Sequence, residues 1–361
     1  MKSSHTTANF SGDRLRIARY RAGFNIRELA DIVELSHAAI SQYETGRAKP
    51  NAAALARLAM ATGMPAEFLT YGDRNVSMAG LDGTHFRSLR STSKQHRANA
   101  WTWSEMVLDV VQVLENYVRF PATLVPEFTL APGAGREQVR LAAERVRAQW
   151  ELPEGPVGHL VRHMEKHGIV VSRMPVADDG IDAFSQYQST RPVVILGTNK
   201  GDAARSRFDA AHELGHLVAH PEADPGGTQE SQAHAFAAEL LMPEEPMLRL
   251  LPKRYDLSAY ARLKHEWGVS IAALLYRART LEVITDAAYR RAVVALNSDY
   301  GRRREPFPLQ RSDDPTMLAT AADLADAAGI SLTRIASEAR LALADVELII
   351  AGSVTRPAVP L

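Results

Sequence analysis

The sequence lacks several features that would point to particular classes of protein. It contains no cysteine, which excludes disulfide bonds, thiolate catalysis and cysteine-ligated zinc, so any metal site must use histidine and carboxylate side chains. No uninterrupted apolar run is long enough to span a membrane, and residues 1–5 contain no apolar signal segment. We therefore expect a soluble, cytoplasmic protein with no membrane partner.

The chain also lacks net charge, because 42 Lys and Arg balance 42 Asp and Glu over 361 residues. The balance is uneven along the sequence: residues 1–72 carry nine basic and six acidic side chains, a surplus of three. A modestly basic N-terminal end on a neutral protein fits DNA bound at that end. Binding by one copy would be weak, so we expect a homodimer on a two-fold-symmetric site. The length allows two to three domains.

The most informative stretch is His-Glu-x-x-His at residues 212–216, inside a helical pattern. Positions i and i+4 lie one above the other on a helix, so His212 and His216 can present ring nitrogens to one ion. Glu213 stands where such sites need a carboxylate to accept a proton from water. Gly215 allows a neighbouring helix to approach closely. Zinc is the metal that this set of ligands favours.

A third ligand is expected on a second helical segment, residues 229–242. Glu230 is the preferred candidate, because a carboxylate on a small apolar helix face is costly to bury unless it is paired or bound to metal. The residues that share its face are Ala233, Ala237 and Leu241. His234, one turn further on, is the rival ligand, and Glu239 is expected to project into solvent. His220 is expected to cap its helix or to hydrogen-bond to the ligands.

These two segments resemble one family. The stretches 211–217 (Ala-His-Glu-Leu-Gly-His-Leu) and 230–243, which ends in Phe-Ala-Ala-Glu-Leu-Leu-Met-Pro, are similar to the ImmA/IrrE family of zinc metallopeptidases. The resemblance covers roughly residues 86–306. It extends to three further stretches, residues 86–91, 142–150 and 267–279.

The resemblance implies His212, His216 and Glu230 as zinc ligands here, with Glu213 as the catalytic base. It also implies an endopeptidase that cuts a transcriptional regulator or an immunity repressor. One departure stands out, since the family usually has Asn where this chain has His234. That substitution leaves an extra ligand or an altered water environment open.

Residues 14–69 predict five short helices around a small core. Residues 34–36 form the turn between the second and third helices, and Ser36 caps the helix at residues 37–44. Gly46 and Pro50 end it. The predicted core residues are Leu15, Ala18, Leu29, Ala30, Val33, Ile40, Leu55, Leu58 and Phe68.

This pattern resembles the helix-turn-helix of phage-repressor-like (XRE) regulators, including Ile-Ser-x-Tyr-Glu-x-Gly-x-x-x-Pro at residues 40–50. In that arrangement the helix at residues 37–44 enters the major groove. The candidate base-facing residues are His37, Ala38, Ser41 and Gln42, and Arg47 and Lys49 are expected to contact phosphates. Ile26, where the family commonly has Gln, and the small Ala38 depart from the pattern.

The expected fold is therefore α+β and mostly helical. It comprises a helix-turn-helix domain (1–72), a linker (73–100), a zincin-like peptidase domain (101–306) and a helical C-terminal extension (307–361). A small sheet should precede the metal helix, with strands at residues 169–174, 182–188 and 192–196. Residues 182–188 are the expected edge that holds a substrate peptide.

Two classes of function follow from these observations. In the first, the protein binds an operator in double-stranded DNA and is a zinc endopeptidase that cleaves a small repressor or regulator. In the second, it is a non-proteolytic regulator, or an antitoxin-like partner, in which the zinc fold senses a ligand or stabilises structure. The intact Glu213 favours the first class, because a structural metal site needs no base.

Overall fold

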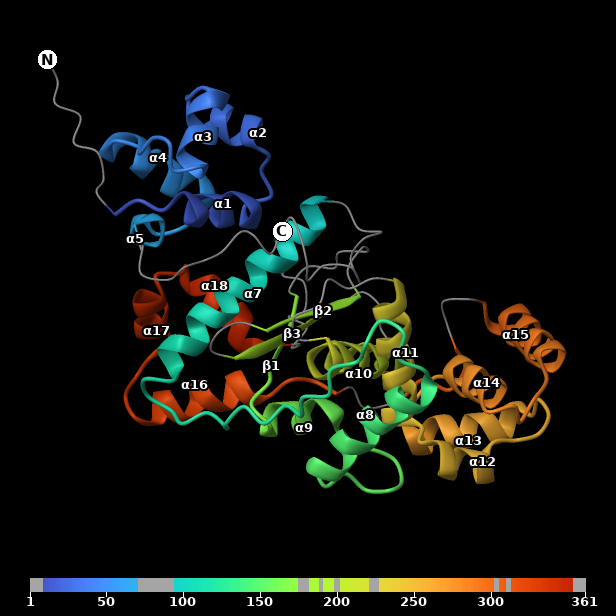
Figure 1. The fold of residues 1–361 in the computed structure, drawn as a ribbon. Coiled ribbons are helices and arrows are strands. Elements are labelled where there is room, and N and C mark those ends of the chain that lie inside the picture. The colour runs from blue at the N-terminus through green and yellow to red at the C-terminus, as the bar shows by residue number, and fades with distance from the viewer. Residues whose placement is uncertain are drawn as a thin grey trace, which may run out of the picture. The chain divides into compact units, whose positions relative to one another are not determined.

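The structure, a computed structural model, describes residues 9–70, 94–174, 182–187, 191–197, 202–220, 227–301, 305–309 and 313–352. Helices dominate it, and one three-stranded sheet accompanies them (Figure 1), which confirms the predicted α+β, mostly helical class. The chain divides into two compact units, residues 1–120 with 318–361, and residues 121–317. Among the described residues, no helix is long and apolar enough to cross a membrane.

The first unit begins with a five-helix domain. Its helices are α1 (Gly12–Arg21), α2 (Ile26–Ile32), α3 (His37–Glu44), α4 (Ala52–Thr62) and α5 (Ala66–Leu69). The expected N-cap is present, since the Ser36 hydroxyl accepts a hydrogen bond from the Ala39 amide at 3.1 Å. All nine predicted core residues are buried. The sequence-based prediction of this domain is thus confirmed.

Helix α3 is fastened to α1 by a buried ion pair. The Arg19 guanidinium donates to both carboxylate oxygens of Glu44, at 2.5 and 3.0 Å, and both side chains are about 4% exposed. Beyond α3, Gly46 has φ +70°, a left-handed conformation that L side chains rarely adopt. The ion pair and the glycine together fix where α3 lies and where it ends.

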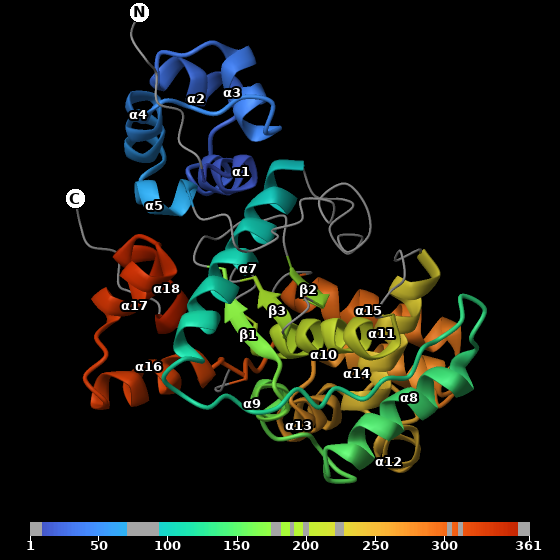
Figure 2. The same ribbon diagram turned by 60° about the vertical axis from the view of Figure 1, so that its left-hand side comes forward.

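Helices from both ends of the chain complete the first unit: α7 (Lys94–Leu114), α16 (Met317–Ala327), α17 (Leu332–Ala339) and α18 (Leu343–Ala351). Both α17 and α18 pack against α7 (Figure 2). Arg14 of α1 pairs with Asp109 of α7, and Arg21 of α1 pairs with Asp345 of α18 at 2.7 Å.

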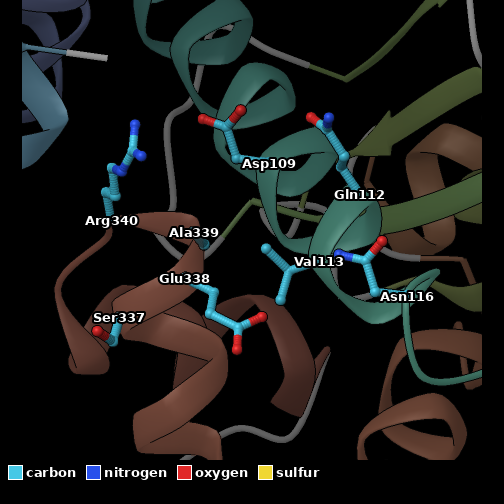
Figure 3. A pocket seen from close by; sticks show the side chains of 8 residues that line it. All are labelled: Asp109, Gln112, Val113, Asn116, Ser337, Glu338, Ala339 and Arg340. Atoms are coloured by element: carbon cyan, nitrogen blue, oxygen red, sulfur yellow. The ribbon is translucent and has the colours of Figure 1, made fainter. Parts of the chain in front are cut away.

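This grouping differs from the sequence-based boundaries, which place residues 101–120 with the peptidase domain and treat residues 307–361 as a separate extension. A compact unit is defined by contacts and need not be a folding domain, so those boundaries stay predictions. A hollow of about 360 Å³ lies between α7 and α17. Figure 3 shows residues that line it, with Asp109 and Gln112 on α7 and Glu338 and Arg340 on the opposite side.

The second unit contains the sheet and the remaining helices. Its strands are β1 (Val170–Arg173), β2 (Ala183–Tyr187) and β3 (Pro192–Leu196). Its helices are α8 (Arg136–Gln149), α9 (Leu160–Lys166), α10 (Ala203–Ala219), α11 (Gly227–Leu241), α12 (Glu244–Leu250), α13 (Leu257–Trp267), α14 (Ile271–Thr280) and α15 (Asp286–Tyr300).

The strand order is β1-β3-β2, with β1 parallel and β2 antiparallel to β3. All three predicted strands are present, and β2 stands at one end of this order; residue 188 lies outside the described part of the chain. In register, Val171 and Ser185 both face Val194 of the central strand. Helix α10 packs against β2 and β3 (Figure 1), which brings the predicted metal helix onto the sheet.

Helices α10 and α11 pack closely because of one glycine. A Cβ added at Gly215 would lie 2.9 Å from the Phe236 ring and 3.3 Å from the Ala233 Cα. Such distances leave no room for a side chain. The predicted close approach at Gly215 is therefore confirmed, and it sets the spacing between the two helices that carry the candidate ligands.

Candidate functional site

Three side chains converge between α10 and α11. Nε2 of His212 lies 3.1 Å from Nε2 of His216 and 3.3 Å from Oε2 of Glu230, and Nε2 of His216 lies 3.5 Å from Oε1 of Glu230. Among the described residues, these three form the one group of His, Asp and Glu side chains close enough to share a metal ion. Each is partly buried, with 13–31% of the side chain exposed.

The charges of this group are coupled. Burial alone would lower the pKa of His212, but the hydrogen bond and charge of Glu230 and the charge of Glu213 outweigh it and raise that pKa. Burial alone would raise the pKa of Glu230, but its interactions with the adjacent His212 and His216 rings lower it strongly. The carboxylate is therefore held ionised beside the two rings, which is the form that binds a cation.

Glu213 lies next to the cluster in sequence but is held separately. Its side chain is only 2% exposed, and its Oε2 accepts a hydrogen bond from the Ser185 hydroxyl at 2.7 Å. Ser185 belongs to β2, so the sheet fixes the orientation of this carboxylate. A buried carboxylate with one oxygen held by a neutral donor keeps its other oxygen available for a proton.

His220 joins His216 to the protein interior through a chain of hydrogen bonds. The Gln232 amide nitrogen donates to the Ala131 carbonyl at 2.9 Å, and its Oε1 lies 2.8 Å from His220 Nε2. Nδ1 of His220 lies 3.3 Å from Nδ1 of His216. Burial lowers the pKa of His220, which favours its neutral form.

The donor and acceptor roles in this series of hydrogen bonds assign the tautomers of His220 and His216. Because Gln232 Oε1 only accepts, the proton of neutral His220 is on Nε2. Its Nδ1 then accepts a hydrogen bond from the Nδ1–H of His216. His216 Nε2 is consequently left as a lone pair that faces His212 and Glu230, as a metal ligand requires.

The rival ligand lies elsewhere. His234 is exposed, and its ring packs on Phe208 at 4.9 Å and on Tyr276 at 5.7 Å between centroids, outside the group of three. The expectation that Glu239 projects into solvent is wrong. Glu239 is 4% exposed and pairs with Arg277 of α14, a partner 38 residues away that the helical pattern does not reveal.

Most of the candidate DNA-contacting residues are exposed on the five-helix domain. His37, Ala38 and Gln42 are exposed on α3 and Ser41 is half-buried, whereas Ile40 on the opposite side is fully buried. Arg47 and Lys49 are exposed in the segment after α3. The four candidate base-facing residues thus share one face of α3 by helical spacing, and the two candidate phosphate-contacting residues follow its C-terminal end.

Sequence reasoning missed two residues of the site, Ser185 and Gln232. Ser185 lies within the predicted edge strand, but nothing local marks its contact with a helix that begins 18 residues later. Gln232 carries a weak signal, since it is a polar residue at helical spacing from the buried Phe236.

Two families have sequence models that match parts of the chain. Residues 12–68 match the sequence model of the helix-turn-helix domain family, and residues 164–279 match a peptidase family described as the IrrE N-terminal-like domain. The second match spans the sheet and the helices from α10 to α14. No curated protein matches the chain. The chain therefore joins a helix-turn-helix DNA-binding domain to a peptidase-like domain of the ImmA/IrrE family.

Proposed function

We propose that the protein is a DNA-binding transcriptional regulator whose second unit is a zinc-dependent endopeptidase that cleaves a repressor or another regulator protein. The observation that carries the proposal is the convergence of His212, His216 and Glu230, with the buried Glu213 beside them. A metal ligand set together with a separate carboxylate is what hydrolysis of a peptide bond requires.

The three side chains fit zinc. Tetrahedral coordination at about 2.0–2.1 Å places ligand atoms about 3.3 Å apart, and the three separations here are 3.1, 3.3 and 3.5 Å. Oε1 of Glu230 is buried without a hydrogen-bond partner among the described residues, and such an atom is costly unless a cation satisfies it. With three protein ligands, a fourth position remains for water or substrate.

A zinc ion bound there supplies a Lewis acid that activates water near neutral pH and polarises the peptide carbonyl. The residues of the chain perform the proton transfers. Glu213 accepts the proton of the attacking water and passes it to the leaving amine. Ser185 holds one Glu213 oxygen and so restricts the orientation of this carboxylate. Tyr187, which is 46% exposed on β2, is a candidate hydrogen-bond donor to the substrate.

At the other end of the chain, we propose that α3 reads the operator. His37, Ala38, Ser41 and Gln42 would meet base edges in the major groove, and Arg47 and Lys49 would meet phosphates. The exposure of His37, Ala38, Gln42, Arg47 and Lys49 supports this role. Because one domain of this size contacts few bases, we propose that a homodimer binds a two-fold-symmetric site.

The test compares wild type with Glu213→Gln, and Glu266→Gln, an exposed carboxylate of α13, is the matched control. Zinc content is measured first, and we expect about one ion per chain in all three proteins because Glu213 is not a ligand. The proteins are then incubated with extract of the host cell, and new protein N-termini are identified by mass spectrometry.

Wild type and Glu266→Gln should produce the same new termini, and Glu213→Gln should produce none of them. If the zinc-loaded wild type generated no termini beyond those of Glu213→Gln, proteolysis would be rejected. The zinc fold would then be a sensor or a structural element of the regulator.

A further inference from the structure

A second hollow lies beside the candidate metal centre in the same unit, with a volume of about 430 Å³. It is formed by α10, α11 and α14. Ala238 and Met242 are its buried residues, and the rings of Phe208, His234 and Tyr276 line it. Asp209 and Arg205 of α10 also line it.

Helical spacing fixes the position of this hollow relative to the metal ligands. Phe208 precedes His212 by four residues on α10, and His234 follows Glu230 by four residues on α11. Each lies one turn, about 5.4 Å, along the same helix face as a ligand. The hollow therefore begins one turn from the candidate metal centre on both helices that build that centre.

This distance suits the side chain next to a cleaved bond. An extended peptide advances by about 3.3–3.6 Å per residue, so a residue that flanks the attacked carbonyl places its side chain within one helical turn of it. The small residues Ala238, Ala272 and Ala273 leave room for a large side chain, and the three rings provide apolar and aromatic contact.

We propose that this hollow binds a large aliphatic or aromatic side chain of the substrate, on a residue that directly flanks the scissile bond. The proposal rests on the proposed function and adds to it the class of peptide that is cut. It also gives His234 a role as a wall of this pocket, in contact with Phe208 and Tyr276.

Two amino-acid hydroxamates test the proposal, because a hydroxamate binds a zinc ion directly and its side chain then probes the neighbouring hollow. Leucine hydroxamate and glycine hydroxamate are titrated into the zinc-loaded full chain by calorimetry. Burial of the leucine side chain should make its binding roughly tenfold to hundredfold tighter.

The matched variants are Ala272→Trp and Ala287→Trp. Both alanines are exposed second residues of their helices, α14 and α15, but only Ala272 lines the hollow. Ala272→Trp should place a ring over the hollow and remove most of the preference for leucine. Ala287→Trp should leave that preference unchanged.

A metal-free arm separates this proposal from the proposed function. Binding of N-acetyl-leucine amide and N-acetyl-glycine amide to the chelator-treated protein is followed by saturation-transfer NMR. If Ala272→Trp abolishes a leucine signal, the proposal that the hollow binds a large side chain is supported, even when neither hydroxamate binds. Failure of both hydroxamates to bind would then reject only the proposed zinc site. Equal binding of the two hydroxamates, or a leucine preference that survives Ala272→Trp, would overturn the proposal and leave the zinc site standing.

Discussion

Helix α3 exposes His37, Ala38 and Gln42, whereas α10 buries Glu213 almost completely and its two candidate ligand histidines partly. The exposed side chains of α3 take their position from the helix, and the Arg19–Glu44 ion pair holds that helix against α1. The side chains of α10 are each held by a contact of their own, since His216 contacts His220 and Glu213 contacts Ser185.

The difference follows from what each surface has to do. A side chain that reads base edges must be free to enter a groove, so rigidity is needed in the helix rather than in the side chain. A metal ligand or a base must hold its position to a fraction of an ångström, which requires a packed and hydrogen-bonded environment. Substitutions of exposed residues in α3 should therefore change DNA binding with little change in stability. Substitutions at the site in α10 should change metal binding and stability together.

The largest effect is expected where α3 is fastened. Arg19→Met leaves the carboxylate of Glu44 buried without its main partner, which costs about 3 kcal/mol, the lower end for a broken buried pair. The lower end applies because Arg16 remains 3.5 Å from Glu44. Hydrogen exchange of the α1 and α3 amides in the full chain measures the loss.

Arg57→Met is the matched control, since the Arg57–Glu34 pair is long, at 3.8 Å, and exposed. It should cost less than about 1 kcal/mol. Equal protection of the α3 amides in the two variants would show that the buried pair does not fix the reading helix.

The next effect tests the packing of α10 on α11. Gly215→Ala forces a methyl group against the Phe236 ring and the α11 backbone, and such overpacking costs about 1–3 kcal/mol. It should also weaken zinc binding, because α11 carries Glu230. Gly158→Ala is the control, since a methyl group there meets nothing within 4 Å. Thermal unfolding in which Gly215→Ala matches Gly158→Ala would contradict this account.

The contrast between local and distant contacts also decides what the sequence could predict. Ser36 caps α3 through an amide three residues away, and the histidines of α10 are four residues apart, so both patterns are visible within one helical turn. The periodicity of residues 14–69 predicted nine core residues of the first domain, and all nine are buried, because each short helix buries one apolar face.

Contacts between residues distant in sequence leave no such pattern. Ser185 meets Glu213 across 28 residues, and Glu239 was predicted to be solvated because its partner Arg277 lies on another helix. The C-terminal helices pack against α7, far from them in sequence. The 2.6 Å hydrogen bond from Tyr117, just after α7, to Glu338 of α17 joins residues that are 221 positions apart. Buried polar side chains in helices are thus the positions where the sequence misleads, because the partner decides their exposure.

A third prediction concerns the contacts that hold His216. His220→Ala removes the acceptor of the His216 Nδ1 proton, and loss of such a partner lowers metal affinity by about tenfold to hundredfold. Competition with a chromophoric zinc chelator measures the affinity. His234→Ala is the control and should leave the affinity unchanged. The reverse result, with His234 essential and His220 dispensable, would mean that the ligand set is assigned wrongly.

The smallest effect on stability is expected at the reading surface. Gln42→Ala removes an exposed side chain and should change the free energy of unfolding by less than about 0.5 kcal/mol. It should nevertheless relax the preference at one base pair of the operator, because only a base-edge contact is lost.

Arg47→Ala should weaken binding to all sequences alike and reduce the salt dependence by about one counterion. Selection of bound sequences from a random DNA library measures the base preference of each variant. Titrations of DNA binding at several salt concentrations measure its salt dependence, and the two measurements together distinguish the variants. A uniform loss for Gln42→Ala would show that Gln42 contacts the backbone, and α3 would then position the domain on DNA without reading bases through this residue.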